Sequence, residues 1–273
     1  MAPPLEANPL SAMIILLLTL VSPHSSFPPA MDSTVAFYSL IVFAVAFASG
    51  LLALVRKWSE AQLHTIVAFG AGIFLGATFI HLLPESMEGA YSKEAGAMVL
   101  VGFLLVLFVE RFLLSRGGEA GHAHTHMVVS MTALVGLSLH TLIGGLGLAV
   151  GAEQPELGKA VLVSILAHKI PETFVMVTLM MLAGIRYSRI IVNLLFLCAM
   201  TPIGALLLAQ VVPVGGSRAL SMLTGLVAGT FLYVATGNLL PEVFHLRERR
   251  GWHLALLVIG AVFMGWLGFA WHD

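Results

Sequence analysis

Eight stretches of predominantly apolar residues follow one another along this chain, and they restrict its fold more than any other feature. They cover residues 34–55, 63–83, 96–114, 127–150, 159–183, 190–212, 219–240 and 252–271. A helix of about 20 apolar residues is long enough to cross the hydrocarbon core of a bilayer. Only 10% of the residues are charged, against about 25% in soluble proteins. The sequence therefore predicts an all-α, polytopic membrane protein with eight transmembrane helices and the lipid bilayer as its solvent.

The distribution of lysine and arginine predicts the orientation of these helices. Nine of the 13 basic residues lie near or after the C-terminal ends of the odd-numbered stretches: Arg56, Lys57, Arg111, Arg116, Arg186, Arg189, Arg247, Arg249 and Arg250. Three others, Lys93, Lys159 and Arg218, belong to the opposite side. Cytoplasmic loops carry the excess of Lys and Arg, so we expect a multi-pass protein with both termini extracytoplasmic, in a plasma or inner membrane. The net charge of −1 predicts no nucleic-acid partner.

The first 30 residues stand apart from the eight stretches. The run "LSAMIILLLTLV" at 10–21 is too short to span a bilayer, and "SPHSSFPPA" at 22–30 interrupts it. Residues 1–30 fit a signal peptide, although Glu6 rather than a basic residue precedes the apolar run. They fit equally an N-terminal extension before a true start at Met31. Residues 31–273 are expected to form the eight-helix domain.

An internal repeat links the second and seventh stretches. The segment "GIFLGATFIHLLPE" at 72–85 aligns with "GTFLYVATGNLLPE" at 229–242, with seven of 14 positions identical. Under the predicted orientation, the two copies cross the membrane in opposite directions. Repeats of opposite topology are typical of secondary transporters, whose sites lie between the repeated halves. The alignment favours a 3+2+3 inverted repeat, in which helices one to three mirror helices six to eight.

The two middle helices carry ionisable residues at membrane depth. The fourth stretch contains His140, and the fifth contains His168, Lys169 and Glu172. Such residues cost about 2.5–3.5 kcal/mol on insertion scales, so they indicate function. His168 and Glu172 are four residues apart and share a helix face, and Pro171 removes a backbone N–H between them. Two imidazoles and a carboxylate suit zinc and similar divalent ions.

Each of these features has a plainer structural interpretation. His140 fits a hydrogen bond between helices, and His168 and Glu172 fit a buried ion pair. The ammonium group of Lys169 could neutralise Glu172 without any metal. Met176 and Met180 favour core packing over ligation. The conjunction on two central helices favours the metal site, with Gly144, Gly145 and Gly147 expected to let the fourth helix approach its neighbour closely.

Three further polar groups lie near the helix ends. His122, His124 and His126 fall in the predicted cytoplasmic loop 115–127 and suggest loose metal binding. His81, Glu85 and Glu88 follow the second helix, where they fit an entrance for cations or ordinary solvated groups. Glu242 and His245 are the mirrored candidates for an exit.

These motifs together resemble the ZIP family of divalent metal transporters. The resemblance runs from about residue 34 to the end and is most specific in "LH" at 139–140 and "HKIPE" at 168–172. It implies transport of zinc, or of iron, manganese or cadmium, towards the cytoplasm, with no cofactor beyond the transported ion. It also implies that helices one, four, five and six move against helices two, three, seven and eight, commonly in a homodimer.

The resemblance also implies which residues hold the metal. His140, His168 and Glu172 match the family's first metal site. Several positions depart from the family pattern: Phe74 stands where many members have Met, Thr141 where Asn is frequent, Gly144 where an acid is usual, and Lys169 where Asn or Asp is frequent. We therefore expect a one-metal site, in which the Lys169 ammonium replaces the second cation and holds Glu172 ionised.

Three functions remain to be distinguished. A one-metal importer accounts for all the motifs, and its uptake should fall below about pH 6 because imidazole ligands must be neutral. An intramembrane metal-dependent hydrolase would use the same ligands, but the chain has no H-E-x-x-H motif and no second carboxylate near the site to act as a base. A transport-inactive metal sensor fits the departures at Gly144 and Lys169.

Overall fold

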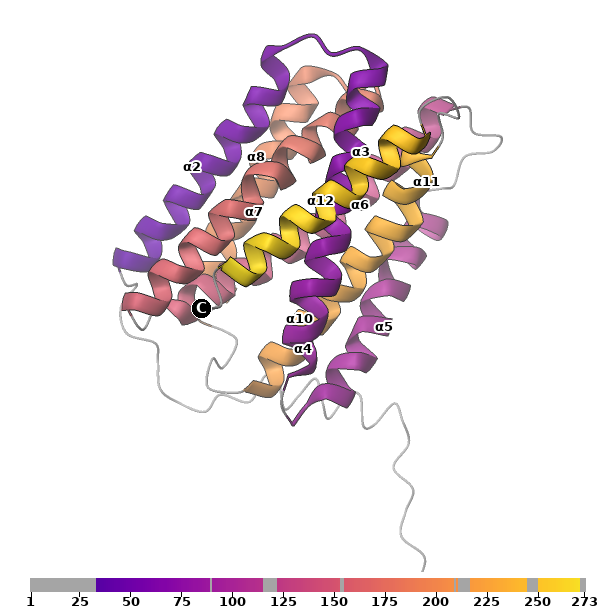
Figure 1. Cartoon of the computed structure of the whole chain (residues 1–273). Coiled ribbons are helices and arrows are strands. Elements are labelled where there is room, and N and C mark those ends of the chain that lie inside the picture. Colours follow the sequence, from indigo (N-terminus) through magenta and orange to yellow (C-terminus); the bar gives the residue numbers. More distant parts are fainter. Residues whose placement is uncertain are drawn as a thin grey trace, which may run out of the picture.

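The computed structural model is a bundle of long helices, shown in Figure 1. It describes residues 33–88, 90–114, 122–152, 155–208, 210, 217–244 and 250–270, within which there is no β-strand. The elements are α2 (Ser33–Val55), α3 (Glu60–Gly76), η1 (Ala77–Leu82), α4 (Leu83–Met87), α5 (Ser92–Phe108), η2 (Val109–Leu114), α6 (His122–Gly151), α7 (Pro155–Leu182), α8 (Tyr187–Ile203), η3 (Gly204–Leu208), α10 (Ser217–Tyr233), η4 (Val234–Leu239), α11 (Leu240–Val243) and α12 (Arg250–Ala270). The elements marked η are π-helical turns that continue a neighbouring α-helix.

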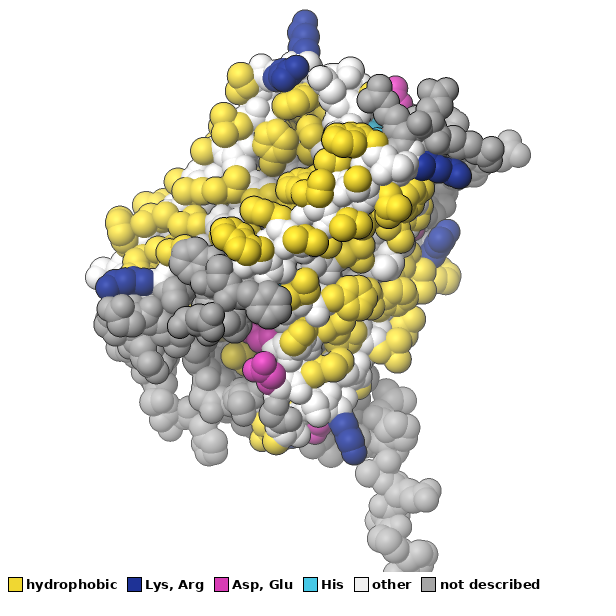
Figure 2. All heavy atoms as spheres, viewed as in Figure 1, with side chains coloured by type: hydrophobic (Ala, Val, Ile, Leu, Met, Phe, Trp, Pro, Cys, Tyr) yellow, Lys and Arg dark blue, Asp and Glu magenta, His cyan; other side chains and the backbone are white. Residues whose placement is uncertain are grey.

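As predicted, eight helices among the described residues are long and apolar enough to span a membrane. The spans, numbered one to eight in chain order, are Ser33–Val55, Glu60–Met87, Ser92–Phe112, His126–Ala149, Val161–Leu182, Tyr187–Leu207, Arg218–Val243 and Arg250–Leu267. Large apolar side chains such as Leu52, Val262 and Trp266 are exposed on the outer surface of the bundle. Figure 2 shows that hydrophobic side chains cover the middle of one face, as a lipid-facing surface requires.

Local sequence signals determine where several helices begin. Ser59 caps α3: its side chain accepts a hydrogen bond from the Gln62 N–H, and the Gln62 side chain accepts one from the Ser59 N–H. Pro84 and Pro241 lie in the first turns of the short helices α4 and α11, where a missing N–H costs little. Pro171, by contrast, lies inside α7, which continues through it to Leu182.

The helices pack as two groups of four spans. The first group contains α2, α6, α7 and α8, and the second contains α3, α5, α10 and α12 with their short continuations. In the second group α5 packs along α10 and α12 along α3, while contacts of α3 with α7 and of α6 with α10 join the two groups. This division corresponds to the moving and static sets that the sequence resemblance implies.

The first and last described helices begin and end at one end of the bundle (Figure 1). We call this the α6–α7 end, and the opposite one the α2–α3 end, after the connections that they carry. Lys and Arg of the described residues are more frequent at the α2–α3 end: Arg56, Lys57, Arg111, Arg186, Arg189 and Arg250 lie there, against Lys93, Lys159 and Arg218 at the other end. Residues 1–32, on which the signal-peptide interpretation depends, lie outside the described part.

The two copies of the sequence repeat make equivalent contacts. A Cβ on Gly72 would overlap the carbonyl oxygen of Leu257 in α12, and a Cβ on Gly229 would overlap that of Val99 in α5. The π-helical turns η1 and η4 also occupy matching positions in the aligned segments. These equivalences are what a repeated unit would produce, whereas the 3+2+3 inverted arrangement itself stays a prediction.

Candidate metal centre

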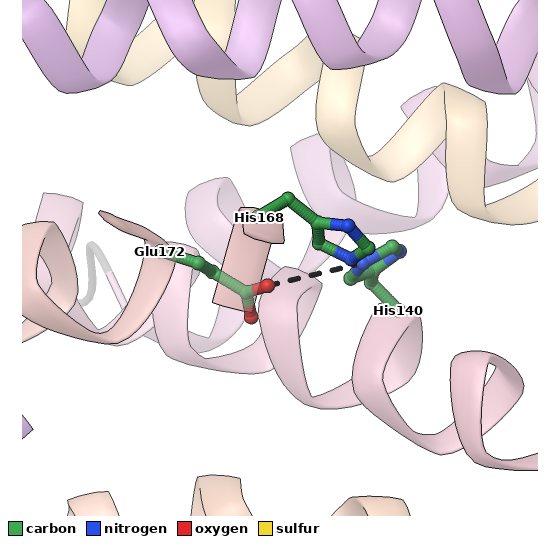
Figure 3. A group of neighbouring side chains, drawn as sticks. All are labelled: His140, His168 and Glu172. Atoms are coloured by element: carbon green, nitrogen blue, oxygen red, sulfur yellow. Dashed lines mark ion pairs between the residues drawn. The ribbon is translucent and has the colours of Figure 1, made fainter. Parts of the chain in front are cut away.

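Three predicted ligands meet between α6 and α7 in the first helix group. His140 comes from α6, and His168 and Glu172 come from consecutive turns of α7 (Figure 3). One potential ligand atom from each residue lies within 4.8 Å of those from the other two. The rings of His140 and His168 are 5.6 Å apart between centroids, and Nε2 of His140 is 3.9 Å from Oε2 of Glu172. The three potential ligand atoms therefore face a common point.

The spacing is close to that of a metal site without an ion. Zinc bonds of about 2.1 Å in a tetrahedral arrangement place ligand atoms about 3.4 Å apart. A contraction of at most about 1.4 Å is within reach of small side-chain rotations. Glu172 is buried, and the His140 side chain is only 13% exposed. His168 is half-buried, so the carboxylate of the site is shielded from lipid and water more fully than the imidazoles are.

A backbone contact orients the His168 ring. Its Nδ1 lies 2.8 Å from the carbonyl oxygen of Ser164, one turn earlier in α7. Because a carbonyl oxygen only accepts hydrogen bonds, this contact requires the proton on Nδ1 and leaves the lone pair on Nε2. Hydrogen bonds of this kind commonly hold metal-ligating histidines in place. The His168 ring is thus oriented to bind a metal ion through the lone pair of Nε2.

Lys169 extends into the same site and is almost fully buried. Its Nζ donates to both carboxylate oxygens of Glu172, at 2.7 and 3.0 Å, and to Oγ1 of Thr141 at 2.6 Å. The ammonium group thereby uses its three donors on two residues. Thr141 Oγ1 also lies 3.4 Å from Oε1 of Glu172. Oε1 is thus held by Lys169 and Thr141, while Oε2 faces His140.

An aromatic pair borders the site on the side of the second helix group. The Phe231 ring lies 4.5 Å from the His140 ring, and Phe74 stacks on Phe231 at 5.1 Å between centroids. Phe74 and Phe231 occupy matching positions in the two repeat copies. The sequence analysis singled out Phe74 for its place in the family pattern but missed Phe231. The alignment of the two repeat segments could have identified both phenylalanines, because it places them at the same position.

Hydrogen bonds hold α7 against its neighbours within the first helix group. Ser49 of α2 donates to the carbonyl oxygen of Ile170 at 2.7 Å, next to Pro171. Near the other end of α7, Ser130 of α6 donates to the carbonyl oxygen of Leu179 at 2.8 Å. Such interhelical bonds are valuable in a membrane, where water does not compete for the backbone. They keep the backbone around His168 and Glu172 fixed relative to α2 and α6.

The prediction for the three glycines of α6 is correct only for Gly145. A Cβ there would overlap the carbonyl oxygen of Thr201 in α8, so α6 and α8 approach backbone to backbone. A Cβ on Gly144 or Gly147 would meet no atom within 4 Å. Helical rotation places Gly145 against α8 and turns the other two away from it.

The residues proposed for entrance and exit have different environments. Nε2 of His81 lies 3.3 Å from the carbonyl oxygen of Met264, and Glu85 and Glu88 are exposed near the α6–α7 end. Glu242 is buried at the α2–α3 end, and His245 lies outside the described residues.

The predicted loop 115–127 is wrong in its C-terminal part. The helix α6 already begins at His122, so His124 and His126 also belong to it. Polar residues at the start of a long helix resemble a loop by composition, which explains the error. Of the three side chains only that of His126 lies within the described residues, and it contacts Glu242.

The sequence analysis missed His64 of α3. The residue is 1% exposed, and its Nδ1 lies 3.2 Å from Oε1 of Glu242. Its position in the apolar second stretch was a signal, since an ionisable residue there indicates function by default.

The chain is similar in sequence to known proteins over most of its length. The model of the ZIP zinc transporter family matches residues 30–126 and 115–270, which together cover most of the chain. The chain belongs to the ZIP family. It is 28% identical over 258 residues to zinc transporter ZIP9-A of Xenopus laevis, covering 77% of this chain and 85% of that protein. It is 26% identical over 270 residues to human zinc transporter ZIP2, covering 74% and 86% respectively. Zinc transporter YKE4 of Saccharomyces cerevisiae is 23% identical over 257 residues, covering 79% and 72%.

Membership of the ZIP family determines the class of function. The chain is a multi-pass membrane transporter of divalent metal ions and not an enzyme. The hydrolase interpretation is therefore set aside.

Proposed function

We propose that this ZIP protein carries zinc towards the cytoplasm through a single site formed by His140, His168 and Glu172. The observation that carries the proposal is the convergence of three ligand atoms within 4.8 Å between two central helices. Two imidazole nitrogens and one carboxylate oxygen are a common ligand set for Zn²⁺, with a fourth position open to water. Iron, manganese and cadmium share these ligand types and are the alternative cargoes.

Lys169 supports a one-metal rather than a two-metal centre. Its ammonium group occupies the space beside Glu172 where a second cation would need oxygen ligands. Glu172 can bind zinc through Oε2 while Oε1 keeps its contacts with Lys169 and Thr141. The charge of Lys169 opposes the incoming cation, so it should weaken binding and favour release. A transporter benefits from such a site because the ion must leave after each crossing.

The direction and assembly of the transporter are also part of the proposal. The excess of Lys and Arg at the α2–α3 end predicts that this end is cytoplasmic, in a plasma or inner membrane. His81, Glu85 and Glu88 would then lie on the entry side, and Glu242 and His245 on the exit side. The loops and helix start around His122 and His124 would handle the ion on the cytoplasmic side. We further propose a homodimer, as the family resemblance implies.

Vesicle uptake tests the site. Purified protein is reconstituted into sealed vesicles, and uptake of zinc, cadmium, manganese and iron is compared between wild type, His168→Ala and Glu172→Ala. Structural zinc sites bind with about 10–16 kcal/mol over four ligands, so one ligand accounts for about 3 kcal/mol and about 100-fold in affinity. Each variant should therefore raise the half-saturating concentration by about two orders of magnitude. Glu94→Ala, a partly exposed carboxylate on α5, is the matched control.

Survival of uptake in both site variants, for every metal, would show that the ion crosses elsewhere. The same assay distinguishes a metal sensor, which would bind zinc in detergent without any flux into vesicles.

A further inference from the structure

A cavity of about 260 Å³ lies between the starts of α6 and α8, at the α2–α3 end of the bundle. We call it the α6–α8 groove. It is separate from the ligands of the proposed transport site, none of which lines it. The residues that form its walls are Met127, Met131, Ile185, Arg189, Val192 and Asn193.

The groove lies far from the place where α6 and α8 touch. Both helices start at the α2–α3 end and run in the same direction, and their backbones meet where Gly145 approaches the carbonyl oxygen of Thr201. Met131 precedes Gly145 by 14 residues, which corresponds to about 21 Å of helix. At that distance from the contact, the two methionines of α6 form one wall of the groove. Methionine side chains are flexible and adapt to the shape of an apolar ligand.

An arginine stands at the membrane interface beside the groove. Arg189 is exposed and is the third residue of the sixth span, Tyr187–Leu207, which places it at the depth of the lipid headgroups. Tyr187 is 58% exposed and marks the same interface, where tyrosine is enriched. Within the described part of the chain Arg189 forms no ion pair. A guanidinium group binds a phosphate through two parallel hydrogen bonds.

The deeper part of the groove is apolar and opens towards lipid. Val192, one turn after Arg189, is 63% exposed, and Met131 lies on the opposite wall. Asn193 adds one polar group: its Nδ2 lies 3.9 Å from Sδ of Met180, which is a weak acceptor. An amide nitrogen has two N–H donors, so it can also donate to an ester carbonyl in the groove. A charged mouth above an apolar channel matches the headgroup and acyl chain of a phospholipid.

The charge of the surroundings favours an anionic lipid. Arg186 is exposed one turn before Arg189, and Arg56 and Lys57 lie in the α2–α3 connection at the same end. Basic pockets between spans bind anionic headgroups on the cytoplasmic side of membranes, which is the side that we propose for this end. A zwitterionic lipid would bring its ammonium group towards these positive charges.

We propose that the α6–α8 groove binds one anionic glycerophospholipid, whose phosphate pairs with Arg189 and whose acyl chain lies against Met131 and Val192. The lipid fills the space between α6 and α8 and stabilises their packing at the α2–α3 end. This goes beyond the proposed transport function and does not depend on it, so failure of either proposal leaves the other standing.

Lipid binding is measured by native mass spectrometry of the purified, delipidated protein in detergent. One dioleoylphosphatidylglycerol per chain should bind more tightly than dioleoylphosphatidylcholine. Arg189→Gln should weaken that binding about tenfold, because a hydrogen-bonded charge is removed. Val192→Trp keeps the arginine but fills the groove, and it should weaken binding to a similar extent. Arg218→Gln removes a half-exposed arginine at the opposite end and is the control, with unchanged affinity.

Several results would overturn the proposal. Equal affinity for the two lipids, or full affinity in Arg189→Gln, would mean that the lipid binds the outer surface without a site. Full affinity in Val192→Trp would mean that the phosphate binds the arginines without the groove. Displacement of the lipid by millimolar inorganic phosphate would indicate a site for free anions. Loss of a dimer in Val192→Trp, with lipid binding unchanged, would identify the groove as a contact between two copies.

Thermal unfolding gives an independent result on the same proteins. A ligand at ten times its Kd should raise the Tm of a chain of this size by about 3–6 °C. Phosphatidylglycerol should produce this increase in the wild type and in Arg218→Gln, but not in Arg189→Gln or Val192→Trp. An equal increase in all four proteins would contradict a specific site.

Discussion

Removing one member of the buried Lys169–Glu172 pair should destabilise the protein far more than removing both. The ammonium nitrogen of Lys169 lies 2.7 and 3.0 Å from the carboxylate oxygens, and the side chains are 2 and 5% exposed. At an effective dielectric constant of about 20, opposite charges about 3 Å apart attract by about 5 kcal/mol. Breaking such a pair from one side costs about 3–5 kcal/mol, because the remaining charge stays buried without a partner.

The perturbation is a double-mutant cycle of Lys169→Met and Glu172→Gln. Thermal unfolding is followed in detergent by circular dichroism or by a fluorescent dye that does not react with thiols. A loss of 3–5 kcal/mol corresponds to a decrease of about 6–20 °C in Tm, at about 2–4 °C per kcal/mol for a chain of this size. The double variant should lose no more than either single variant, since replacing a buried ion pair by neutral groups is often neutral.

An exposed ion pair of the same protein provides the control cycle. Arg218 and Glu94 are 3.9 Å apart, with side chains 50 and 41% exposed. Surface pairs contribute about 0–1 kcal/mol, so Arg218→Met and Glu94→Gln should have small and additive effects. Additive losses in the Lys169–Glu172 cycle, or single losses as small as those of the control, would refute a buried ion pair. The account of Lys169 as the substitute for a second cation would then fail.

Two further predictions concern helix packing and pH. Gly204→Ala should lower the free energy of unfolding by about 1–3 kcal/mol, because its Cβ would overlap the carbonyl oxygen of Leu142, whereas Gly144→Ala should be silent because its Cβ meets open space. Thermal melts of the two variants check this, and equal losses would disprove the close approach of α6 and α8. Zinc uptake should fall rather than rise as the pH is lowered, because the imidazoles of His140 and His168 must be neutral to bind the ion. Uptake at a constant membrane potential measures the profile, and uptake that increases as the pH is lowered would argue against histidine ligands.

The site was predictable where its residues are close in sequence. His168, Lys169 and Glu172 lie on adjacent turns of one helix, so helical periodicity alone brings them to the same region. The pairing of Lys169 with Glu172 followed from this spacing and was considered from the sequence. His140 was predicted to join them because it lies on the neighbouring span in the chain. The structure brings its ring to 5.6 Å from that of His168.

Contacts between spans distant in sequence were not predictable in the same way. Nothing in the apolar second stretch indicates that His64 meets Glu242, which is 178 positions later. The stacking of Phe74 on Phe231 likewise depends on how α3 and α10 are rotated. Gly144 and Gly145 have the same local sequence context, yet only Gly145 faces α8 at close range.

The sequence by itself determined that eight helices span a membrane and which of them carry ionisable groups. The reason is that lipid offers no hydrogen bonds, so a long apolar segment must satisfy its backbone internally as a helix. Only the tertiary structure decided which side chains of different helices meet, including His140 with Phe231 and His64 and His126 with Glu242. In these helices apolar residues lie on every face, so no local pattern states which face turns inward. The rotation of each helix about its axis is settled by packing against its neighbours.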